Sequence, residues 1–102
     1  MSLVQVANYP YTQATPIQVG KTTDTVIKAS AGTFFGIIIT TLGVGVPLVY
    51  DNASSSTGTI VGTAIASAPL GFLLAPANGI ACLNGITVKG GATMPGMTIL
   101  WS

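Results

Sequence analysis

The sequence contains no histidine, arginine or glutamate, and its only charged side chains are three lysines and two aspartates among 102 residues. Charged residues make up 5% of the chain, whereas an ordinary soluble domain carries about 25%. Threonine, serine, asparagine and glycine take their place, and hydrophobic residues account for 49%. A surface of neutral polar groups loses less on burial than an ionic one. The composition therefore predicts a protein that works in an assembly and not as a free monomer.

The missing residue types also limit the chemistry. Without histidine a Ser–His arrangement is impossible, and one thiol with two carboxylates cannot complete a zinc site within one chain. Asp51 could be a metal or sugar ligand, but its position before Asn52 and a serine-rich loop favours a turn former. Cys82 lies in an apolar stretch, which favours a buried core thiol. We therefore expect no enzyme, no cofactor and no metal.

Partners and location follow from the same counts. Three lysines, Lys21, Lys28 and Lys89, cannot form a phosphate-binding stripe, so no nucleic-acid partner is expected. A single cysteine excludes an internal disulfide. The first residues, MSLVQV, show no basic region followed by an apolar run, so we expect a protein made in the cytoplasm without a signal peptide.

A membrane protein is the alternative to exclude. No charge occurs between Lys28 and Asp51, and residues 29–50 are long enough for a transmembrane helix. The segment is rich in β-branched residues and is interrupted by glycines and by Pro47, which disfavours a helix. We expect strands here and no membrane partner.

The residue pattern favours an all-β protein. Short apolar runs separated by turn residues, with no helical period, indicate a sandwich or a barrel, and we expect an antiparallel β-sandwich of jelly-roll-like form. The expected strands are residues 24–29, 33–41, 46–50, 59–66, 70–75, 80–83, 86–89 and 97–101. They belong to one domain, residues 21–102. Residues 1–20 form an extended N-terminal arm, which is either a loose terminus or a segment that docks on a neighbouring subunit.

A resemblance to a known group rests on several motifs. GIIITT at 36–41 leads through a glycine turn to LVYDN at 48–52, and GTIV follows at 58–61. NGITV at 84–88, a Gly-Gly turn and TILW at 98–101 complete the pattern. The chain resembles small β-sandwich virion proteins of tailed bacteriophages, of the capsid decoration or cement type. The resemblance implies a structural protein of the virion, assembled in the host cytoplasm, that forms a homotrimer and binds the major capsid protein. It implies no catalytic residues.

Six residues are candidates for intermolecular contacts. They are aromatic or aliphatic and lie in the arm or in apolar strands: Tyr9, Tyr11, Phe34, Ile38, Val49 and Trp101. Trp101 and the phenylalanines could also form a ligand platform, although aromatic residues along strands are more often core. The alternative function is a tail, baseplate or head-fibre module that binds a receptor or glycan, and it needs exposed aromatic residues near Asp51, Asn52 or Asn78.

Overall fold

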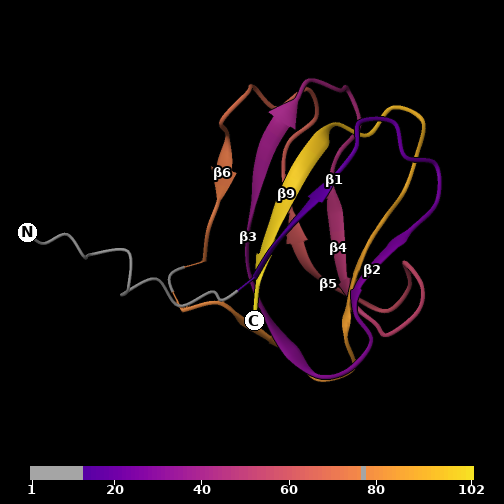
Figure 1. Cartoon of the computed structure of the whole chain (residues 1–102), viewed down its shortest axis with the longest axis vertical. Helices are drawn as coiled ribbons and strands as arrows, with labels where there is room; N and C mark the ends of the chain where they lie inside the picture. The colour runs from indigo at the N-terminus through magenta and orange to yellow at the C-terminus, as the bar shows by residue number, and fades with distance from the viewer. Residues whose placement is uncertain (1–12, 77) are drawn as a thin grey trace, which may run out of the picture.

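The computed structural model describes residues 13–76 and 78–102, and within these ranges the chain forms strands and no helix (Figure 1). The nine strands are β1 (Gln13–Ile17), β2 (Thr25–Lys28), β3 (Gly32–Thr41), β4 (Leu48–Asp51), β5 (Thr59–Thr63), β6 (Leu73–Leu74), β7 (Ile80–Cys82), β8 (Ile86–Val88) and β9 (Gly96–Trp101).

The strands form two antiparallel sheets. Sheet A has the order β1-β9-β3-β6, and β7 pairs with β3 on the same edge as β6. Sheet B has the order β2-β8-β4-β5. The two sheets pack face to face around one hydrophobic core, which makes a sandwich-like single domain. The core combines residues from both sheets: Phe34, Ile37, Ile39, Met97 and Ile99 from sheet A, and Val49, Ile86 and Val88 from sheet B.

The lack of alternation in β3 has a geometric cause. Phe34 pairs with Trp101 and Gly36 with Leu100, so Phe35 is the extra residue of a β-bulge. A bulge shifts the face on which the following side chains lie. Phe34 and Ile37 are three residues apart, yet both are fully buried in the core. Strand β3 lies in the interior of its sheet, between β9 on one side and β6 and β7 on the other.

One close approach between the sheets requires a glycine. A Cβ atom placed on Gly62 of β5 would lie 2.5 Å from Cε2 of Phe34. Glycine is unfavourable within a strand, because it loses the most backbone freedom and offers no side chain to pack. Its presence here lets the Phe34 ring of sheet A lie directly against the backbone of sheet B.

The predicted fold class is confirmed as all-β, antiparallel and single-domain. Strands β3 and β9 coincide closely with the predicted ranges, and the Pro47 that precedes β4 marks the start of the strand. The predicted strands at 59–66 and 70–75 are too long, because only 59–63 and 73–74 pair. Residues 29–50 form β3 and most of β4 where a membrane helix was the alternative. Within the described ranges, no helix is long and apolar enough to cross a membrane.

The segment assigned to the arm is partly described. Residues 13–17 form β1, an edge strand that pairs with β9 from Gln13↔Trp101 to Ile17↔Met97. Ile17 enters the core, and Trp101 Nε1 donates a hydrogen bond to Thr15 Oγ1 at 2.9 Å. This part of the arm therefore belongs to sheet A, and residues 1–12 lie outside the described ranges.

Candidate functional site

The β3–β4 and β5–β6 loops lie at the end of the sandwich where β3 finishes, the upper end in Figure 1, and both carry exposed apolar side chains. Half of the large hydrophobic residues that are exposed among the described residues lie in two loops there, the β3–β4 loop and the β5–β6 loop. We call this surface the apolar end, and it consists of Leu42, Val44, Val46, Ile65 and Leu70. Their exposed fractions range from 37% to 63%. Groups of exposed apolar side chains on a protein surface commonly mark an interaction site.

Hydrogen bonds hold the two loops against each other. Ser67 N donates to Val44 O at 3.3 Å, and Ala64 N donates to Pro47 O at 3.2 Å. A shallow apolar hollow of about 340 Å³ lies between them, lined by Leu42, Gly43, Val44 and Ser67. Ser67 adopts a left-handed backbone conformation with φ of 52°, which is uncommon for a residue other than glycine. The loops therefore present the apolar side chains in a defined arrangement.

The outer strands of both sheets carry features that discourage pairing with another chain. In sheet A, β1 contains Pro16 and β6 has only two residues. In sheet B, β2 carries a register shift and ends at Lys28, and β5 has an extra residue, Val61, opposite the Val49–Tyr50 step. Prolines, bulges, lysines and short strands are the means by which proteins protect sheet edges. Faces and loops, not strand edges, are thus the available contact surfaces among the described residues.

The Asp51 carboxylate closes the opposite end of the sandwich. Its two oxygens accept backbone N–H groups from Leu83 at 3.1 Å, from Asn84 at 2.8 Å and from Gly85 at 3.3 Å. These donors, Asn84 first, lower the pKa of Asp51 below its usual value, because they stabilise the charged form. Of the two roles that the sequence allowed, the geometry matches the turn former: Asp51 organises the β7–β8 turn.

The second carboxylate holds a polar loop over sheet B. Asp24 accepts N–H groups from Gly90 at 2.9 Å and from Ser56 at 3.0 Å, and the Gly90 bond contributes most to lowering its pKa. Asn52 Oδ1 caps the same loop by accepting from Ser54 N, and Asn52 O accepts from the Thr87 hydroxyl at 2.8 Å. Thr87 is fully buried, so this bond satisfies a polar group that would otherwise be costly. Both aspartates therefore have structural partners.

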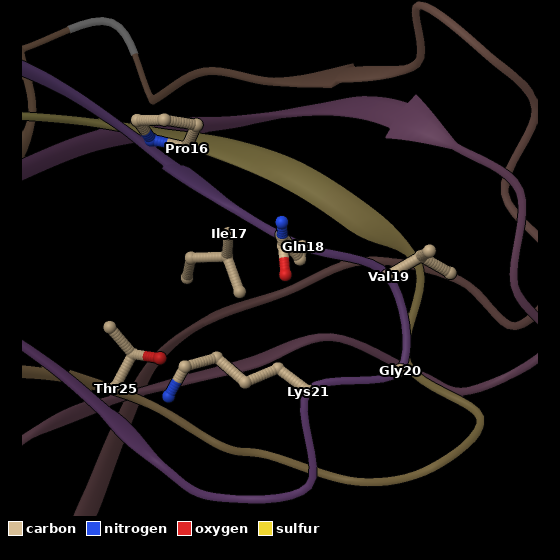
Figure 2. A pocket seen from close by; sticks show the side chains of 7 residues that line it. All are labelled: Pro16, Ile17, Gln18, Val19, Gly20, Lys21 and Thr25. Carbon is tan, nitrogen blue, oxygen red and sulfur yellow. The ribbon is translucent and has the colours of Figure 1, made fainter.

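A second hollow, also about 340 Å³, opens between the β1–β2 loop and β2 (Figure 2). Figure 2 shows the Lys21 side chain running below Ile17 towards Thr25. Its ammonium group donates to Thr23 Oγ1 at 2.9 Å. Lys21 is the only charged residue among the seven that line this hollow, so the lining offers no second positive charge for an anionic ligand.

The remaining reactive groups of the described ranges do not converge. Cys82 is buried at 1% exposure, and burial first of all raises the pKa of its thiol, which keeps it in the less reactive protonated form. No group of three or more histidine, cysteine or acidic residues that could hold a metal occurs in residues 13–76 and 78–102.

The structure separates the six contact candidates. Phe34 and Val49 are fully buried in the core, which corrects their assignment as contact residues, because core side chains cannot reach a partner. Ile38 and Trp101 are partly exposed, and the Trp101 ring lies 5.8 Å from Lys28 Nζ. Tyr9 and Tyr11 lie outside the described residues. None of the residues of the apolar end was among the predicted contact residues. Leu42 and Val44, apolar residues in the glycine turn after the strand at 33–41, carried a signal, whereas Ile65 and Leu70 resemble strand residues.

Comparison of the chain with known protein families, with curated proteins and with solved structures finds no match.

Proposed function

We propose that the protein is a structural component of a virus particle, most simply a decoration protein that stabilises a bacteriophage head by binding the major capsid protein as an oligomer. The support is a single combination: a small β-sandwich with five charged residues and a group of large hydrophobic side chains exposed at one end. A soluble monomer normally keeps such groups apart and surrounds them with charge. A homotrimer, which the resemblance implies, and a jelly-roll-like strand arrangement remain part of this proposal.

The described polar groups support a structural role over catalysis. Asp24 and Asp51 accept hydrogen bonds from main-chain N–H groups, which keeps the loops of a neutral protein in place. A protein with such a role needs a rigid shape and surfaces that are inexpensive to bury. We therefore propose a binding and stabilising role without chemistry.

The receptor- or glycan-binding alternative receives less support. It needs a carboxylate or amide free to bind sugar hydroxyls beside an exposed aromatic residue. Asp51 already accepts three backbone hydrogen bonds, and Asn52 Oδ1 accepts two from Ser54 and Ser55. The geometry uses these groups for the fold.

The test is the composition and stability of the particles. Mass spectrometry of density-purified phage particles from cells that carry the gene should find the chain in many copies per particle. Particles lacking the gene product should release DNA at a lower temperature or after milder osmotic shock. Absence of the chain from purified particles would overturn the proposal, and its presence in tails alone would replace the head by the tail as its place.

A further inference from the structure

We infer that the apolar end, formed by Leu42, Val44, Val46, Ile65 and Leu70, is the surface through which copies of this chain pack on one another. The inference rests on the proposed structural role, and it names a second copy as the occupant of one particular surface. The sequence suggested the faces of the strands at 33–41 and 46–50 for this contact. Of the three contact candidates in those strands, Phe34 and Val49 are core residues, and Ile38 is partly exposed.

Charge is the first reason to assign a second copy. Segments 42–47 and 64–72 contain no charged residue. An ordinary protein carries about a quarter of charged residues, so a different partner would need a patch free of charge to cover this end without leaving unpaired charges, which is costly. Another copy of this chain offers an equally neutral surface, so nothing ionic has to be desolvated.

The arrangement of residues is the second reason. Protein interfaces have an apolar centre and a polar rim. Around the apolar end lie the exposed Thr40, Thr41, Ser67 and Thr93, which can form hydrogen bonds and carry no charge. Leu70 is adjacent to Gly71, whose N–H donates to Ile39 O at 2.9 Å, so the β5–β6 loop is tied to the end of β3. The centre and the rim therefore belong to one surface.

Rigidity is the third reason. Gly45 N donates to Thr93 O at 2.9 Å, and a Cβ on Gly43 would lie 2.7 Å from the Pro95 backbone. Both contacts hold the β3–β4 loop against the segment before β9. A loop that is ordered before binding loses little conformational freedom on association. The apolar end is thus prepared for contact within a single subunit.

The size of the apolar end sets the expected strength. Full burial of one Val, Leu or Ile side chain removes on the order of 60–120 Å² of apolar surface, so five half-exposed ones contribute roughly 150–300 Å² per copy. A standard interface buries about 800 Å² per partner. The apolar end therefore provides the centre of a small interface, and we expect self-association in the micromolar range that becomes firm only when several contacts act together.

The experiment is sedimentation velocity of the full chain over a concentration series from about 1 to 200 μM. We expect the wild type to associate, and the double variant Leu42→Ser/Leu70→Ser to raise the dissociation constant at least 100-fold. The matched control is Leu83→Ser, because Leu83 is the most exposed large hydrophobic residue of the described ranges at 78% and lies beside Asp51 at the opposite end. This control should associate as the wild type does. Unchanged association of the double variant, equal weakening by Leu83→Ser, or a wild type that stays monomeric throughout would each overturn the inference.

A second measurement does not depend on weakening the self-association by a substitution. Val44→Cys should be joined to a second copy by a short bis-maleimide reagent, whereas Leu83→Cys should not, because position 83 lies at the opposite end of the sandwich. The native Cys82 is buried, so it does not react in either variant. Absence of cross-linking at position 44 overturns the inference even if a serine variant fails to fold. The two proposals can fail separately. If the copies associate through another surface and the chain is still found in particles, only this inference is wrong. If the copies associate through the apolar end but the chain is absent from particles, only the virion role is wrong.

Discussion

The replacement of Asp51 by asparagine tests the structural role of the carboxylates most directly. Asp51 Oδ1 accepts from Asn84 and Gly85, and Oδ2 accepts from Leu83. Asparagine keeps one accepting oxygen and turns an NH₂ group towards one of these N–H donors, which leaves at least one bond broken. The substitution therefore removes the charge and part of the hydrogen bonding without changing the size of the side chain.

The expected loss can be bounded. A hydrogen bond to a charged group contributes about 1.5–3 kcal/mol when shielded from water, and solvent access lowers this contribution. Asp51 is only partly buried. We therefore expect Asp51→Asn to lower the free energy of unfolding by about 1–2 kcal/mol, where each kcal/mol lowers the Tm of a domain of this size by about 4–8 °C.

Two measurements distinguish the loss of the Asp51 hydrogen bonds from a general loss of stability. Urea denaturation at low protein concentration gives the free energy of unfolding, and amide hydrogen exchange followed by NMR reports on Leu83, Asn84 and Gly85 individually. These three amides should exchange faster in Asp51→Asn and remain protected in Asp24→Asn, whose carboxylate accepts from other residues. If the stability changes by less than 0.5 kcal/mol, on the order of ordinary surface substitutions, and the three amides keep their exchange rates, the structural reading of Asp51 is wrong.

Two further predictions follow from the same contacts. Hydrogen bonds lower the pKa of both Asp24 and Asp51 in the folded state, so their stabilisation is complete above the pKa of the unfolded chain and is lost as the pH falls through the lower folded values. The free energy of unfolding should therefore be nearly constant from about pH 5 to 8 and decrease below about pH 4. Urea denaturation at a series of pH values measures this, and a series without a decrease in acid would contradict it. Gly62→Ala should lower the free energy of unfolding by about 1–3 kcal/mol, since the new Cβ would meet the buried Phe34 ring. Thermal melts measure this, and Thr63→Ala, an exposed change in the same strand, should have a much smaller effect. A Gly62→Ala variant more stable than the wild type would refute the close packing.

Strand assignment from the sequence succeeded where β-branched residues were dense and turn residues bounded them, as in β3 and β9. It overextended β5 and β6, because apolar loop residues such as Ile65 and Leu70 look like strand residues until pairing partners are known. Strand β1 was not predicted, since Pro16 and a lack of alternation conceal an edge strand whose pairing depends on β9. Gly79 has a positive φ of 74°, a conformation that an Asn-Gly pair such as Asn78-Gly79 adopts readily in turns.

The contact candidates show the same division. Val49 and Phe34 could have faced either way, because an apolar residue in a strand with two apolar faces does not reveal which face is inside. The bulge at Phe35 decided the orientation of β3. The partners of Asp51 are 32 to 34 residues away in the chain, and those of Asp24 are 32 and 66 residues away, beyond any local pattern.

Composition and local pattern alone determined that this chain is an all-β single domain with almost no charge, because strand-forming residues and turn residues act over a few positions and charges can simply be counted. Only the tertiary structure decided which apolar residues are core, which loops meet, and that the uncovered hydrophobic side chains collect at one end. Those properties depend on sheet pairing and bulges between distant segments, and pairing is a property of the whole fold, not of any single stretch.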